Sequence, residues 1–445
     1  MINNLKCILF NNLLKLKRFF RDRLKKKDNS RGSFLVIILL ILSGELVFML
    51  PYVLARIFRP TFLEVFNLTN LELGSLFSIY GIVALLSYVY GGVLSDKYEP
   101  KKLISLSLIF TSFGGLVMAT YPPYLLMQIL YGYWGFTTVF LFWGAMIKAT
   151  RVWGGNESQG LAFGLLDGGR GLVAASFGTI GVIIFSFFLS SDIKISTLIE
   201  RRESFRYVII FSSLMVFITG LMVHFFMDSN KSKEKISSEN KNSISQIKEV
   251  LKIKSVWLIM LIIISAYMGY KVTDVYSLYA SDVMNFDQIE SANVGSIQLY
   301  LRPITCFIIS AIVLKSRYID FIIIGFMTML LGSILFATGL IKIDMNLIFY
   351  FSLFIVATGT YAIRALYFSI MQEGKIPLIY TGTAVGLISV IGYTPDIFAT
   401  PIFGYLLDTY PGIRGHQLVF LILVFFSIIG LISSIKFKRL KKSIN

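Results

Sequence analysis

Twelve long apolar segments constrain the fold of this chain more than any other feature of its sequence. A transmembrane helix needs about 20 mostly apolar residues, and each segment reaches that length. Only 15% of the residues are charged, whereas a soluble domain averages about 25%. The sequence therefore predicts an all-α membrane protein with spans at 34–58, 72–95, 102–121, 124–149, 158–189, 205–227, 255–280, 290–315, 318–340, 345–371, 378–406 and 416–437.

A polar stretch divides these spans into two sets of six. Residues 228–254 are rich in Lys, Ser, Asn and Glu, as expected of a solvated linker. The first residues combine a helical apolar face with many basic residues, which is typical of an arm on a membrane surface; a plain orientation signal is an equal alternative. We expect a basic amphipathic arm at 1–33, a six-helix bundle at 34–227, the linker, a second bundle at 255–437 and a tail at 438–445.

The two halves repeat short motifs in the same order. Gly74-Ser75 in the second span matches Gly295-Ser296 in the eighth, and residues 160–165 in the fifth span match 382–387 in the eleventh. Such parallel repeats are typical of secondary transporters, in which the solute site lies between the halves near the membrane midplane. The repeat predicts two parallel six-helix units and transport by alternating access.

Basic residues are concentrated in alternate connections between spans, including Lys15–Lys27, Lys97–Lys102, the linker and Lys436–Lys442. By the positive-inside rule, these connections and both termini are cytoplasmic. We therefore expect a multi-pass protein of the plasma membrane, which in a bacterium is the inner membrane. The net charge of +17 belongs to this pattern and not to a soluble basic domain, so we expect no nucleic-acid partner.

Eight ionisable residues lie deep inside the apolar spans. A charged residue at the centre of a membrane helix costs about 2.5–3.5 kcal/mol on insertion scales. Such residues persist only where they pair with one another or line a wet cavity, so they predict a polar interior. Four are acidic and four are basic: Glu45, Asp167, Asp274, Asp396, Arg170, Lys271, Arg302 and Arg364.

No motif for catalysis or metal binding accompanies these charges. The Gly-rich stretch 164–171 is not followed by the Gly-Lys-Ser/Thr of a phosphate loop, and the sequence has only two histidines and two cysteines. We therefore expect no enzymatic activity, no cofactor and no metal.

The connection after the second span carries a family motif. It reads Gly-Val-Leu-Ser-Asp-Lys-Tyr-Glu-Pro-Lys over residues 92–101. This resembles the loop motif of the major facilitator superfamily, and the resemblance implies that superfamily's twelve-helix fold. It also implies that Asp96 faces the N-terminal end of span eleven and closes the cytoplasmic side. The gating residues implied by the motif are Gly92, Asp96, Lys97 and Lys101.

Within the superfamily, the stretch from Trp143 through Trp153 to Gly171 resembles the sugar-phosphate and organophosphate permease branch. That branch is expected to place basic residues on spans one and seven. Here span seven has Lys271, while span one has Glu45.

In the superfamily arrangement, spans 1, 4, 7 and 10 line the cavity. Spans 2, 5, 8 and 11 flank it. We therefore expect substrate contacts from charged residues and tyrosines of the lining spans seven and ten and of the flanking span eight: Lys271, Arg302, Arg364, Tyr270 and Tyr361. Glu45 and Asp396 are candidates for proton coupling, because a carboxyl group in a low-dielectric interior takes up a proton more readily than one in water. For Glu45, a static ion pair with Arg364 or Lys271 is an equal alternative.

The remaining charges are candidates for a gating network. Asp167 and Arg170, like Lys271 and Asp274, are spaced i, i+3 and could neutralise each other on one helix face. Alternatively, Asp167 could reach Arg302 across the interface between the halves.

The sequence as a whole predicts a secondary active transporter for a small polar solute, anionic or zwitterionic, in a lipid bilayer. Proton coupling is the first expectation, as in a symporter. The alternatives are an antiporter that exchanges the solute for another anion or organophosphate, a drug exporter, and a sensor that binds solute without transporting it.

Overall fold

The computed structural model describes residues 30–154, 159–189, 196–227, 243–312, 317–376 and 381–444. These residues form helices and no strand. Eleven helical stretches among them are long and apolar enough to cross a membrane. A further long helix, α14 (Gln288–Ile312), has 25 residues and contains Arg302 and Pro303. The predicted all-α, twelve-helix architecture is confirmed.

The N-terminal half supplies the first six spans. Pro51 lies in a short π-helical stretch within span one, where a proline can be accommodated because the regular hydrogen-bond ladder is already interrupted. The helices are α2 (Ser30–Leu46), η1 (Met49–Val53), α3 (Leu54–Ile57), α4 (Arg59–Phe66), α5 (Asn70–Lys97), α6 (Pro100–Met118), α7 (Tyr124–Gly135), η2 (Phe136–Trp143), α8 (Gly144–Gly154), α9 (Gln159–Phe188) and α10 (Leu198–Phe226).

The C-terminal half supplies the other six spans. Besides α14, its helices are α11 (Ser243–Lys252), α12 (Lys254–Val272), η3 (Thr273–Val275), α13 (Tyr276–Asp282), α15 (Tyr318–Ala337), α16 (Asn346–Leu366), α17 (Ile370–Glu373), α18 (Thr381–Gly392), α19 (Pro395–Thr409) and α20 (Ile413–Ile444).

Several boundaries differ from the sequence-based expectation. Helix α10 begins at Leu198 instead of 205, because Thr197 and Glu200 form a capping box that starts the helix before its apolar part. Helix α20 runs on to Ile444, past the predicted end of the last span. Part of the predicted linker is helical, as α11. The predicted arm lies outside the described residues up to position 29.

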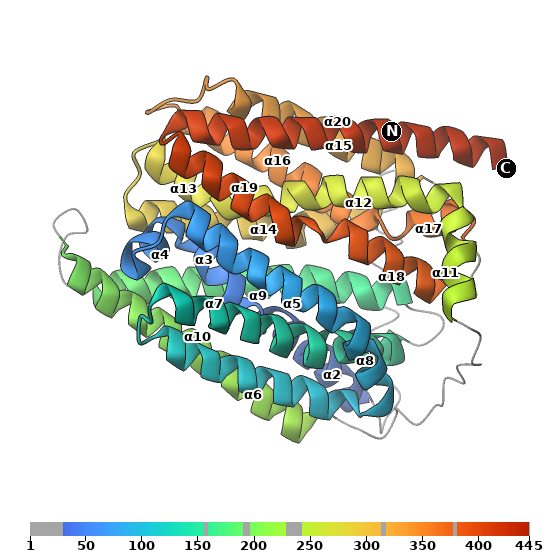
Figure 1. Ribbon diagram of the computed structural model, residues 1–445, viewed down its shortest axis with the longest axis horizontal. Helices are drawn as coiled ribbons and strands as arrows, with labels where there is room; N and C mark the ends of the chain where they lie inside the picture. Colours follow the sequence, from blue (N-terminus) through green and yellow to red (C-terminus); the bar gives the residue numbers. More distant parts are fainter. Residues whose placement is uncertain are drawn as a thin grey trace.

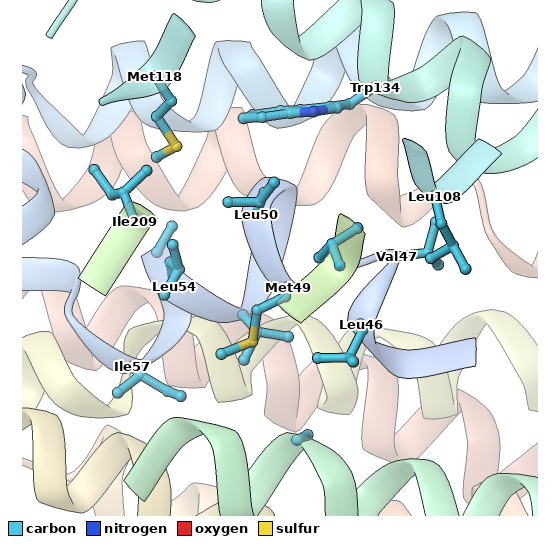
Figure 2. Close-up of a cluster of buried hydrophobic side chains, with 14 of the residues drawn as sticks. Leu46, Val47, Met49, Leu50, Leu54, Ile57, Leu108, Met118, Trp134 and Ile209 are labelled. Carbon is cyan, nitrogen blue, oxygen red and sulfur yellow. The ribbon is translucent and has the colours of Figure 1, made fainter. Parts of the chain in front are cut away.

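Each half has its own hydrophobic core. The N-terminal half (blue to green) and the C-terminal half (yellow to red) form two layers of helices (Figure 1). One buried cluster is drawn almost wholly from residues 39–227 and the other from 250–437. Figure 2 shows part of the first core, where Leu50 lies below Trp134. Each half is therefore packed largely around its own core.

The halves meet along two helix pairs, α5 with α19 and α9 with α14. Small residues permit this close approach. A Cβ atom on Gly74 of α5 would lie 2.4 Å from the main-chain oxygen of Thr400 in α19. We call the end of the bundle near residues 66–70, 282–288 and 409–413 the far end, and the end with α11 the linker end.

Candidate solute-binding site

Four charged side chains from both halves form a buried ion-pair cluster. The Nε of Arg56 in α3 lies 2.5 Å from Oδ1 of Asp274. The Nζ of Lys271 lies 3.0 Å from Oδ2 of Asp274 and 3.3 Å from Oδ1 of Asp396. The i, i+3 spacing at the end of α12 brings Lys271 and Asp274 together, as predicted from the sequence. Lys271 therefore links two carboxylates on different helices.

Two tyrosines connect this cluster to Arg364. The hydroxyl of Tyr267 donates to both carboxylate oxygens of Asp396, at 3.0 Å each. The hydroxyl of Tyr270 accepts a hydrogen bond from Nη1 of Arg56 at 3.0 Å. The Cζ of Arg364 lies 4.0 Å from the ring centre of Tyr270 and 5.5 Å from that of Tyr267. These are cation–π distances, so the rings face the guanidinium.

Arg364 itself lacks a carboxylate partner among the described residues. None of the central ion pairs includes it. Its Nε and Nη1 atoms are buried and donate to no acceptor in the described part of the chain. An unpaired buried charge is costly, so these donors are suited to an acceptor supplied by a ligand.

A second cluster joins the halves through span one. Oε2 of Glu45 lies 3.1 Å from Nε of Arg170 and 3.6 Å from Nη1 of Arg302. Nη2 of Arg302 in turn lies 2.5 Å from Oδ1 of Asp167. Of the two arrangements left open by the sequence, the structure therefore has Asp167 against Arg302, across the α9–α14 interface. The cluster contains two cations and two carboxylates.

Within each cluster, the side chains differ in their access to solvent. The side chains of Asp167, Asp396 and Arg170 are 34%, 20% and 13% exposed. Those of Glu45 and Lys271 are 4% and 1% exposed. All five lie inside the bundle, and solvent reaches the first three more readily than the last two.

Other predicted site residues have different surroundings. Tyr361 is fully buried and donates a 2.9 Å hydrogen bond to Oε1 of Gln298, which links α16 to α14. Lys101 is partly buried in the first turn of α6. The side chains of Gly92, Asp96 and Lys97 lie outside the described part of the structure.

Two buried arginines of the first half were not among the predicted site residues. Arg56 and Arg59 are each 2% exposed. Arg59 donates to Oδ1 of Asn70 and, at 3.4 Å, to the main-chain oxygen of Asp274. Both follow the apolar part of span one, where a basic residue usually belongs to the membrane interface. Arg56 lies inside the predicted span 34–58, and this position could have identified it as a buried charge from the sequence.

Two six-helix units that enclose buried charges from both halves define a multi-pass membrane protein with a transporter fold. The Major Facilitator Superfamily model matches residues 33–400. The chain belongs to this family, and the predicted resemblance to the superfamily is confirmed.

Two curated relatives are bacterial inner membrane proteins. The chain is 27% identical to the inner membrane protein YqcE of Escherichia coli (strain K12) over 402 residues, which cover 88% of this chain and 91% of that protein. It is 26% identical to the inner membrane protein YihN of the same strain over 408 residues, with 89% and 93% covered.

Solved transporters share the fold at low identity. A bacterial homolog of the human lysosomal transporter Spinster, in an inward-facing and unoccupied conformation, has a TM-score of 0.71 and 12% identity, with 93% of this chain and 98% of that chain covered. The nucleoside transporter NupG has a TM-score of 0.68 and 13% identity, with 92% and 99% covered. These likenesses show the fold alone.

Proposed function

We propose that this protein is a secondary active transporter that moves a small anionic or zwitterionic solute across the membrane by alternating access, coupled to protons. The observation that carries the proposal is that Nε and Nη1 of Arg364, at the centre of the site, have no acceptor in the described part of the chain. The charged side chains of the two clusters, by contrast, each lie within ion-pair distance of an opposite charge.

Charge balance supports an anionic group on the solute. The two clusters and Arg364 together hold five cations and four carboxylates, and each carboxylate lies within ion-pair distance of a cation. The remaining positive charge belongs to Arg364. A carboxylate or phosphate would neutralise it, whereas a cationic drug would be repelled. The site therefore favours the anion over the drug-exporter alternative.

The proton site is assigned by contacts and exposure. Glu45 has two arginine partners and a nearly inaccessible side chain. Among the described residues, Asp396 has only Lys271 as a cationic partner, which it shares with Asp274, and its side chain is 20% exposed. Because a proton carrier needs access to water and a carboxylate not held by several cations, we assign this role to Asp396 in preference to Glu45.

Replacing Asp396 with asparagine is expected to separate driven accumulation from exchange. In proteoliposomes, Asp396→Asn should lose solute accumulation driven by a pH gradient, because the amide cannot carry a proton. Exchange of labelled for unlabelled solute should continue. Glu290→Gln, an exposed carboxyl change in the same half, is the control and should leave accumulation intact. Undiminished pH-driven accumulation in Asp396→Asn would rule out this assignment.

A thermal-shift screen tests the proposed solute class. The purified protein and Arg364→Gln would be heated with organic acids, amino acids, sugar phosphates, neutral sugars and hydrophobic cations. A ligand at 100 times its Kd adds about 2.7 kcal/mol to the stability of the folded state. We expect an anionic or zwitterionic compound to stabilise the wild type and not the variant. Stabilisation of both by a cation would contradict the proposal.

Anion exchange is the second candidate, and Arg56 favours it. With this residue, span one does supply a buried basic side chain, as Lys271 does on span seven. Asp274 pairs with both cations, however. If sugar phosphates are the stabilising class in the screen, and if Asp396→Asn leaves all transport unchanged, exchange replaces proton coupling as the mechanism.

A further inference from the structure

Asp408, in the last turn of α19, joins the two halves at the far end. Its Oδ1 accepts hydrogen bonds from the main-chain N–H of Asn70 at 2.9 Å and from Nδ2 of the same residue at 3.1 Å. Its Oδ2 accepts from the main-chain N–H of Leu71 at 2.6 Å. Asn70 and Leu71 are the first two residues of α5. One carboxylate of the C-terminal half therefore holds the N-terminus of a helix in the other half.

This contact is not needed to start α5, because the helix has a local cap. Thr69 Oγ1 accepts from the N–H of Glu72 at 3.1 Å, and the Glu72 carboxylate accepts from the N–H of Thr69 at 2.8 Å. Asp408 takes the two N–H groups that this capping box leaves free. A negative charge there also interacts favourably with the helix dipole. The Asp408 contact therefore serves to attach the two halves to each other and not to start helix α5.

The surrounding packing holds the contact in place. A Cβ atom on Gly404, one turn before Asp408, would lie 2.3 Å from the main-chain oxygen of Asn70. The two backbones therefore touch at this point, which brings the short Asp408 side chain within reach. Arg59 donates to Oδ1 of Asn70 at 3.1 and 2.9 Å and so fixes the orientation of its amide.

The sequence around Asp408 repeats the family motif of α5. Gly404-x-Leu-x-Asp408 at the end of α19 matches Gly92-x-Leu-x-Asp96 at the end of α5. The two helices run in opposite directions, so the first motif lies at the far end and the second at the linker end. The same helix pair thus carries one Gly-x-Leu-x-Asp motif at each of its ends.

We propose that Asp408 is the far-end latch of the transport cycle and the counterpart of the latch predicted for Asp96. Among the described residues, the hydrogen bonds that join the halves lie in two places. Some are at the far end, such as the bond from Thr61 to Gln288, and the others are around the central charges. With the far end closed, the Asp408 contact is formed. When the far end opens, Asp408 leaves the N-terminus of α5 and the Asp96 contact replaces it.

Distance measurements between spin labels test the latch without any solute, so they are independent of the proposed function. In a Cys7→Ser, Cys306→Ser background, labels at Thr120→Cys and Lys342→Cys report on the far end. Labels at Lys102→Cys and Lys442→Cys report on the linker end. All four positions are exposed. In Asp408→Asn, the ratio of molecules open at the far end to molecules closed there should rise roughly tenfold, because the charge-assisted hydrogen bonds of the closed state are lost.

Asp344→Asn is the matched control, because Asp344 is exposed at the far end and its positive φ of 70° suits asparagine equally well. It should leave the distance distributions unchanged. Gly404→Ala provides a second test that keeps all charges, and it should also lengthen the far-end distance. Asp96→Asn should shift the ratio in the opposite direction. Wild-type far-end distances in both Asp408→Asn and Gly404→Ala would overturn the proposal.

Discussion

Asp274→Asn is expected to lower the thermal stability of the protein more than any other single change in the site. The carboxylate of Asp274 neutralises both Arg56 and Lys271, whose side chains are 2% and 1% exposed. Removing one partner of a buried ion pair destabilises a protein by about 3–5 kcal/mol, because the other charge stays buried without compensation. Thermal unfolding of the purified protein in detergent, followed without solute, measures this loss.

A charge-balanced double variant shows whether the loss is electrostatic. Lys271→Gln combined with Asp274→Asn leaves Arg56 and Asp396 as one cation and one carboxylate, and should recover part of the stability. Asp344→Asn, an exposed aspartate of the same half, should unfold like the wild type. If Asp274→Asn also unfolds like the wild type, the cluster does not stabilise the fold as inferred here.

The second large effect is expected on solute binding. Arg364→Gln should weaken binding of the anionic solute by about 30-fold or more, because losing one partner of a buried hydrogen-bonded charge pair costs about 2–5 kcal/mol. Without solute, the same variant should be at least as stable as the wild type, since the unpaired guanidinium is a cost to the fold. A titration followed by thermal shift measures both quantities.

Two further variants separate charge from geometry. Arg364→Lys keeps the charge but lacks the planar set of donors, so it should bind more weakly than the wild type and better than Arg364→Gln. Arg317→Gln removes a guanidinium that is 63% exposed and should have no effect on binding. A lower stability of Arg364→Gln without solute, with unchanged affinity, would mean that Arg364 serves the fold and not the solute.

The latch proposal and the binding proposal depend on different residues and different measurements. The spin-label distances concern α5 and α19 at the far end, whereas the thermal shifts concern Arg364. Either proposal can therefore fail while the other holds.

The architecture was predictable from the sequence because it depends on length and polarity along each segment. Apolar segments of about 20 residues must cross the bilayer as helices, since the membrane offers no other partner for the backbone groups. Local contacts were also predictable where helix geometry alone determines them. Lys271 and Asp274 are an example, since their i, i+3 spacing places them side by side.

Only the tertiary structure decided which distant charges meet. Asp167 contacts Arg302 and not Arg170 on its own helix, and Arg56 pairs with Asp274, which is 218 residues away in the chain. Such partners depend on how each helix is rotated about its axis and shifted along its neighbour. The apolar pattern of a helix that is buried on most sides constrains neither quantity. The sequence alone therefore determined that the interior is charged, while the packing of the helices decided that Nε and Nη1 of Arg364 have no acceptor among the described residues.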